Sequence, residues 1–224
     1  MVNVRAERSA GWSAICFVVV AAIAFSLAGP LPDLHATPAA IASYFDAHRA
    51  GLLWSAWLTL PAAGLYLWFL VGLTTYLTEA PGRQEGLAML AFAAGVLIAA
   101  ESFATAFLQS ALAYGPTGTF VANSLQSLYI AFIFSMSGLG WAPVAIFFFA
   151  ASHSMRRHRS APSWLAYFGY FASFTASVAS LSIFFHDPSL SPTGFGCALL
   201  GAVPAFIWLL GTGFVLVRTP VLPD

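Results

Sequence analysis

The chain has 224 residues, of which 60% are hydrophobic and only 7% carry a charged side chain. Its eight cationic residues are all arginine, and eight acidic residues balance them to a formal net charge of zero. Such a composition leaves too little polar surface for a soluble domain, and the lack of a basic surplus argues against nucleic acid as a partner. The sequence therefore predicts a protein whose solvent is the lipid bilayer.

Six long apolar runs follow one another along the chain. Each is close to or above the ~20 residues that a helix needs to cross a hydrocarbon layer about 30 Å thick. The runs cover residues 11–29, 52–77, 86–113, 124–152, 163–185 and 196–217. The sequence predicts an all-α membrane protein in which residues 1–224 form a single domain, a bundle of six transmembrane helices.

The positions of the arginines predict how this bundle is oriented. Placing the amino terminus in the cytoplasm leaves Arg49 outside and puts the other arginines on the cytoplasmic side: Arg5, Arg8, Arg83, Arg156, Arg157, Arg159 and Arg218. The reverse orientation violates the positive-inside rule. We expect both termini to be cytoplasmic.

The connection at residues 30–51 is long enough to carry structure of its own. Thr37 followed by Pro38 is typical of a helix N-cap with proline in the first turn. An apolar face then repeats at helical spacing through Ile41, Tyr44, Phe45, His48 and Leu52. These features predict a short amphipathic helix over residues 37–49 on the outer face.

The segment from Thr37 to Arg49, TPAAIASYFDAHR, and the aromatic-rich run after it resemble small, uncharacterised multi-pass integral membrane proteins of bacteria. The resemblance covers the first two runs, and for the rest of the chain it extends to topology. It implies a bacterial inner membrane protein, and it implies no activity or catalytic residue.

Glu101 is the one acidic or basic residue deep inside an apolar run. A carboxylate at that depth is unfavourable by several kcal/mol unless it is protonated, paired or hydrated. Thr105 and Gln109 follow it at intervals of four residues, so the three side chains share one helical face. We expect this polar stripe to face other helices and to line a pocket that opens to the outer side.

Other residues are candidates for the same pocket. Asn123 and Gln126 lie at the outer end of the fourth run, Ser177 lies in the fifth, and Trp68 lies deep in the second. Aromatic walls with few polar groups are the usual make-up of a small-molecule site. The leading hypothesis is a binding protein or transporter for a small lipophilic or weakly polar molecule.

Two other hypotheses stay open. An intramembrane enzyme, such as an isomerase, a cyclase or a metal- or haem-dependent oxidoreductase, would use Glu101 as acid or base with His186 as its partner. His48, His186 and Glu101 are also suitable ligand types for zinc or non-haem iron. The third hypothesis is an accessory subunit of a larger membrane complex. Whether the bundle also forms a homo-oligomer stays open. The sequence identifies no cofactor.

Overall fold

The structure is a computed structural model, and it describes residues 4–79, 85–115, 122–158, 160–185, 187 and 189–218. No strand occurs among these residues, which confirms the all-α prediction. Six candidate membrane spans are long and apolar enough to cross a bilayer. The chain is a multi-pass membrane protein.

Nine helical elements form the spans and their connections. They are α1 (Val4–Ala28), α2 (Pro38–Ala47), α3 (Arg49–Glu79), α4 (Glu85–Tyr114), α5 (Ala122–Met136), α6 (Trp141–His158), α7 (Ser163–Ser180), the short 3₁₀ helix η2 (Leu181–Phe184) and α8 (Phe195–Arg218). These nine elements are the helices formed by the residues that the structure describes. The fourth span consists of α5 and α6 together, and η2 extends α7.

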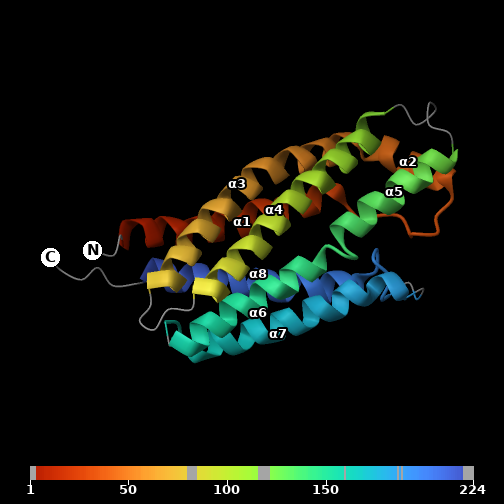
Figure 1. Ribbon diagram of the computed structural model, residues 1–224. Coiled ribbons are helices and arrows are strands. Elements are labelled where there is room, and N and C mark those ends of the chain that lie inside the picture. Colours follow the sequence, from red (N-terminus) through yellow and green to blue (C-terminus); the bar gives the residue numbers. More distant parts are fainter. Residues whose placement is uncertain are drawn as a thin grey trace.

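The spans form a closed ring. In the order α1, α3, α4, α6, α7, α8, each helix packs against the next, and α8 packs back against α1. The start of α1 and the end of α8 lie at one end of the bundle, and α2 lies at the other (Figure 1). The remaining helix, α5, packs mainly against α4 and α2, so it leans away from α7 and α8 at the α2 end (Figure 1).

The predicted surface helix is present as α2. The Thr37 hydroxyl accepts a hydrogen bond from the Ala40 backbone N–H at 3.3 Å, which is the expected N-cap. The apolar side chains of Ile41 and Phe45 are buried. The ring of Phe45 lies 6.1 Å from that of Tyr129 on α5, so α2 packs its apolar face onto the bundle.

Tyr44 ties α2 to the end of α1. Its hydroxyl donates a hydrogen bond to the carbonyl of Ala28, and burial raises the pKa of Tyr44 to about 12. Arg49 belongs to α3 and not to the surface helix, contrary to the predicted range of 37–49. Its guanidinium donates to the Tyr114 carbonyl at 3.3 Å, where a cation meets the negative end of the α4 dipole.

The fourth span differs from the single continuous helix that its apolar run suggests. Helix α5 ends at Met136, and α6 begins at Trp141 after a turn over residues 137–140. Glycines at positions 138 and 140 suit such a turn, and Pro143 falls in the first turn of α6, where its missing N–H leaves no helical bond unmade. The span is therefore broken near its middle.

The protein has two apolar cores, one inside the ring and one between α2, α5 and the adjoining ends of α3 and α4. At the end that carries the termini, Trp208 is fully buried, and its ring lies 5.8 Å from that of Phe147 and 5.0 Å from that of Phe148. At the α2 end, Phe45 and Phe132 belong to a second cluster.

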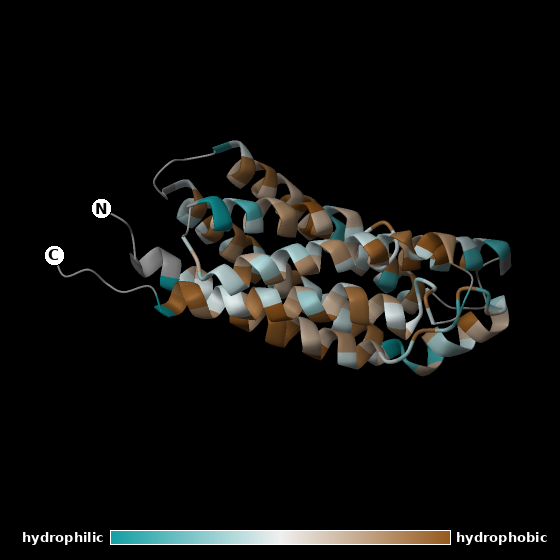
Figure 2. Ribbon diagram, turned by 90° about the horizontal axis from the view of Figure 1, so that it is seen from below, coloured by the Kyte–Doolittle hydropathy of each residue, from teal (hydrophilic) through white to brown (hydrophobic). Residues whose placement is uncertain are grey.

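Large apolar side chains also face outward. Phe174 is 66% exposed and Leu97 is 59% exposed, as expected for contact with lipid. Strongly hydrophilic segments lie mostly toward the two ends of the bundle (Figure 2).

Candidate functional site

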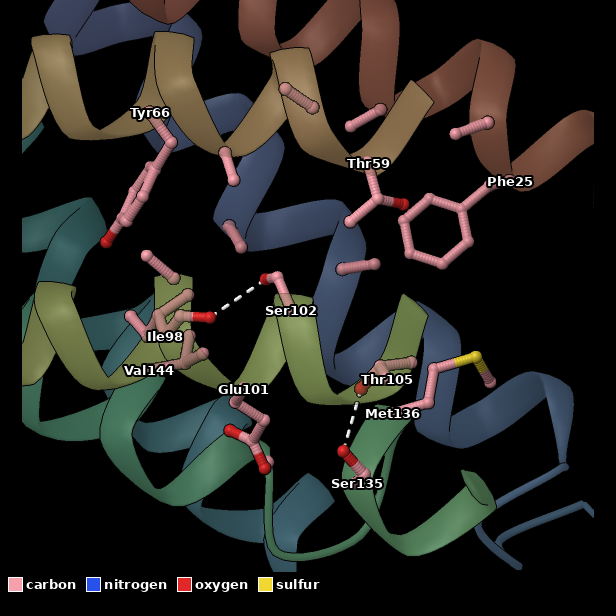
Figure 3. Close-up of a pocket in the computed structure, with 18 of the residues that line it drawn as sticks. Phe25, Thr59, Tyr66, Ile98, Glu101, Ser102, Thr105, Ser135, Met136 and Val144 are labelled. Carbon is pink, nitrogen blue, oxygen red and sulfur yellow. Dashed lines mark hydrogen bonds between the residues drawn. The ribbon is translucent and has the colours of Figure 1, made fainter. Parts of the chain in front are cut away.

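A cavity of about 220 Å³ lies between the two cores. Helices α1, α3, α4, α5, α6 and α8 contribute to its wall (Figure 3). The wall is mainly apolar, and its aromatic residues are Phe17, Phe25, Tyr66, Phe132, Trp141, Phe147, Phe148 and Phe206. Its polar residues besides Tyr66 and Trp141 are Ser55, Thr59, Glu101, Ser102, Thr105, Gln109 and Ser135. All three residues of the predicted stripe are among them.

Glu101 projects from α4 toward the break between α5 and α6 (Figure 3). A Cβ atom added to Gly140 would lie 3.0 Å from Oε1 of Glu101, so the carboxylate lies directly against the glycine backbone. The side chain is partly buried, and no hydrogen bond or ion pair joins its carboxylate to any residue that the structure describes. Glu101 is the unpaired member of the stripe.

The other two members of the stripe bind protein groups. The hydroxyls of Thr105 and Ser135 lie 2.7 Å apart and link α4 to α5. Gln109 is buried, and its side-chain amide donates to the carbonyl of Leu52 at 2.9 Å, which links α4 to α3. Both side chains therefore position the helices around the cavity, and Glu101 is left to interact with what the cavity holds.

The hydroxyls on the wall divide in the same way. Ser102 donates to the Ile98 carbonyl at 2.8 Å, and Thr59 donates to the Ser55 carbonyl at 3.0 Å, so both are satisfied within their own helices. The hydroxyl of Tyr66 is buried and has no partner among the described residues. A buried hydroxyl without a partner is unfavourable by about 1–3 kcal/mol. Tyr66 is thus a second polar group available to an occupant.

The start of α6 gives the Glu101 site its electrostatic character. The first N–H groups of a helix carry the positive end of its dipole, and Glu101 lies beside Gly140, the residue before Trp141. This contact favours the ionised carboxylate by about 0.3–1 kcal/mol, or up to ~2 kcal/mol in a partly buried site. Burial at membrane depth opposes ionisation by several kcal/mol. The dipole alone does not offset that penalty.

The other residues predicted for the pocket lie elsewhere. Trp68 is 61% exposed on the outside of α3, where its indole N–H donates to the Ser9 hydroxyl at 3.2 Å. Asn123 and Ser177 are exposed, and Gln126 is partly exposed. None of the four lines the cavity.

The predicted metal ligands are only partly described. His48 is exposed at the end of α2, and its ring stacks on that of Tyr44 with the centroids 4.6 Å apart. His186 lies outside the described residues. Among the residues that are described, no three potential ligands cluster. The site formed by His48, His186 and Glu101 stays a prediction.

Sequence reasoning missed most of the wall, including Tyr66, Trp141 and Gly140. A signal for the break was present, because Gly138 and Gly140 followed by Pro143 are typical of one helix ending and another beginning. That pattern places Trp141 and Gly140 inside the membrane. Tyr66 carries no such signal.

Comparisons of the chain with protein-family models, with curated proteins and with solved structures give no significant match. The functional inference therefore rests on the geometry of the cavity.

Proposed function

We propose that the protein is a membrane-embedded binding protein or transporter for a small, mostly apolar molecule with one polar group. The observation that carries this proposal is the unpaired carboxylate of Glu101, which faces a cavity with aromatic walls. A few convergent polar groups in an apolar pocket are typical of a small-molecule site. The apolar wall holds the body of the ligand, and Glu101 binds its polar group.

The size of the cavity limits the ligand. An engineered apolar cavity of about 150 Å³ holds benzene. The present cavity, at about 220 Å³, therefore has room for one aromatic ring with a short polar chain, or for an aliphatic body of the same bulk.

We propose that the cavity opens toward the α2 end of the bundle. Phe25 is a wall residue and is also 53% exposed, so it forms part of both the cavity and the outer surface. Its ring lies 6.2 Å from that of Phe206 on α8. Leu31, in the connection to α2, also lines the cavity. A lipophilic ligand enters beside Phe25.

We also propose that the protein lies in a bacterial inner membrane, as the resemblance implies. The arginine pattern supports an orientation with the α2 end outside and both termini in the cytoplasm. A single cysteine introduced as Ser43→Cys on α2 should react with an impermeant thiol reagent in intact cells, and Ser163→Cys at the start of α7 should not. Both side chains are exposed, and the background carries Cys16→Ala and Cys197→Ala. The opposite labelling pattern contradicts the orientation.

The binding hypothesis needs a cavity and a polar group that lines it, and Glu101 is such a group. The enzyme hypothesis needs in addition an acid–base partner for Glu101, and the described residues that line the cavity include no histidine. An accessory subunit would need neither the cavity nor an unpaired carboxylate. For these reasons binding is preferred over the other two hypotheses.

Two fluorinated probes of suitable size test binding: 2-(4-fluorophenyl)ethanol and 2-(4-fluorophenyl)ethylamine. Fluorine NMR measures their saturable binding to detergent-solubilised protein, with empty micelles as the blank. Thr59→Phe should fill the cavity from α3. Thr75→Phe is a matched control, because Thr75 makes the same type of hydrogen bond to the preceding turn but is exposed on the outside of α3.

We expect saturable binding of at least one probe to the wild type and to Thr75→Phe. Thr59→Phe should weaken it by about tenfold or more, a loss of about 1.4 kcal/mol. The proposal fails if neither probe binds saturably, or if Thr59→Phe binds as well as Thr75→Phe does.

A further inference from the structure

The charges on the cavity wall are unbalanced. Among the described residues that line it, Glu101 is the one carboxylate, and there is neither an arginine nor a histidine. Tyr66, on α3, is the one other titratable side chain on this wall, and the described wall residues of α1, α5, α6 and α8 include none. No described wall residue therefore supplies a positive charge to balance Glu101.

The depth of Glu101 makes this imbalance important. It lies 16 residues after the start of α4 and 13 before its end, which places it about 24 Å and about 20 Å from the two helix termini. An unpaired carboxylate at such depth is strongly unfavourable, and the α6 dipole offsets only part of that penalty. A bound proton or a bound cation must supply the rest.

We infer that the ligand class is a small organic ammonium ion with an aromatic or aliphatic body, held with its charged group at Glu101. The inference rests on the proposed function and deepens it. Because Gly140 has no side chain, the carboxylate packs against the backbone of the break, and Glu101 also lines the cavity. The aromatic wall fits the apolar body, and aromatic faces also attract cations.

Other ligand charges fit the wall less well. An anion is repelled by ionised Glu101, and no described cation on the wall compensates for that repulsion. A neutral alcohol can hydrogen-bond to Glu101, but it leaves the charge unbalanced or requires the protonated acid. An ammonium ion satisfies the charge and supplies N–H donors in a single group.

Binding to protonated Glu101 then replaces the bound proton with the ammonium ion. When Glu101 is protonated, its O–H bond breaks as the ammonium ion enters, the proton passes to water, and the ion pair takes its place. The charge of the site is the same before and after: a neutral acid is replaced by a neutral ion pair. The affinity for an ammonium ion therefore rises with pH until Glu101 is ionised in the empty site, and binding below that point releases a proton.

The two fluorinated probes also test this inference, because they differ mainly in the charge of one group. We expect the wild type to bind the amine at least about tenfold more tightly than the alcohol at neutral pH. Glu101→Gln should bring the two affinities to within about threefold by weakening amine binding, because the amide keeps the shape and loses the charge. Asp46→Asn, which removes an exposed carboxylate from α2, is the control and should keep the preference.

The outcomes distinguish a failure of the ammonium inference from a failure of the binding function on which it rests. Equal binding of both probes to the wild type, with loss in Thr59→Phe, overturns the ammonium inference and leaves the binding function intact. Saturable binding of neither probe overturns both. A preference for the amine that persists in Glu101→Gln assigns the selectivity to another group and overturns the inference. Proton release on amine binding, measured with a pH indicator in weak buffer, should also disappear in Glu101→Gln.

Discussion

The carboxylate of Glu101 on α4 lies against the backbone of Gly140 at the break in the fourth span. This contact joins the acidic group of the cavity to the one place where a described span is interrupted by a non-helical turn. The broken span provides room for the carboxylate and the positive end of the α6 dipole. In a continuous helix at this position, the backbone N–H groups would be hydrogen-bonded within the helix. Such a helix would offer Glu101 no helix N-terminus.

Gly140→Ala should destabilise the protein. The added methyl group would lie 2.5 Å from the Ser135 carbonyl oxygen and 3.0 Å from Glu101 Oε1, so the turn must shift. We expect a loss of about 1–3 kcal/mol in the free energy of unfolding, measured by denaturation in mixed micelles. Gly64→Ala is the matched control, because nothing lies within 4 Å of its added methyl group. Equal stability of the two variants contradicts the close contact.

Tyr66→Phe should stabilise the ligand-free protein. It removes a buried hydroxyl that has no partner among the described residues, and such a group is unfavourable by about 1–3 kcal/mol. Tyr129→Phe removes a hydroxyl that donates to the Pro32 carbonyl, so it should lose about 1 kcal/mol. Thermal unfolding compares the two variants. A lower unfolding temperature for Tyr66→Phe, similar to that of Tyr129→Phe, means that the hydroxyl has a partner in the protein.

Gln109→Glu should destabilise the protein and Glu101→Gln should not, although both residues lie on one face of α4. The first places a carboxylate where the Gln109 amide donates to the Leu52 carbonyl, and we expect a loss of about 3 kcal/mol. The second removes an unpaired carboxylate and should leave stability unchanged or raised. Gln126→Glu, at a partly exposed position on α5, should change stability by about 0.5 kcal/mol or less. A large loss in Glu101→Gln shows that the carboxylate is bound within the protein.

The fold could be predicted because its determinants are local. Apolar run length gives the spans, and Thr37 with Pro38 gives the start of α2. The break at residues 137–140 was missed, because a run that is apolar throughout looks the same for one long helix and for two helices joined by a turn. Gly138, Gly140 and Pro143 carried that information, and hydropathy does not detect it.

The site could be predicted only along one helix. Helical periodicity places Glu101, Thr105 and Gln109 on one face, and a costly charge must face inward. It does not distinguish wall residues on other helices, because lipid and protein interiors select the same apolar side chains. For this reason Trp68 was expected in the pocket and lies outside it, whereas Trp141 was missed.

Access to the cavity is tested most directly by the reactivity of a thiol placed on its wall. Ser102→Cys, in the background of Cys16→Ala and Cys197→Ala, puts the thiol next to Glu101 in the chain and on the wall itself. Ala104→Cys, on the exposed face of the same helix, is the control, because its thiol faces the lipid and not the cavity. The reagent is methyl methanethiosulfonate, which is small and neutral.

We predict that Ser102→Cys reacts with this reagent about tenfold faster than Ala104→Cys does, and that Thr59→Phe or saturating 2-(4-fluorophenyl)ethylamine slows the reaction toward the rate of the control. If Ser102→Cys reacts no faster than Ala104→Cys, or if neither Thr59→Phe nor the amine slows it, then no accessible ligand cavity lies beside Glu101.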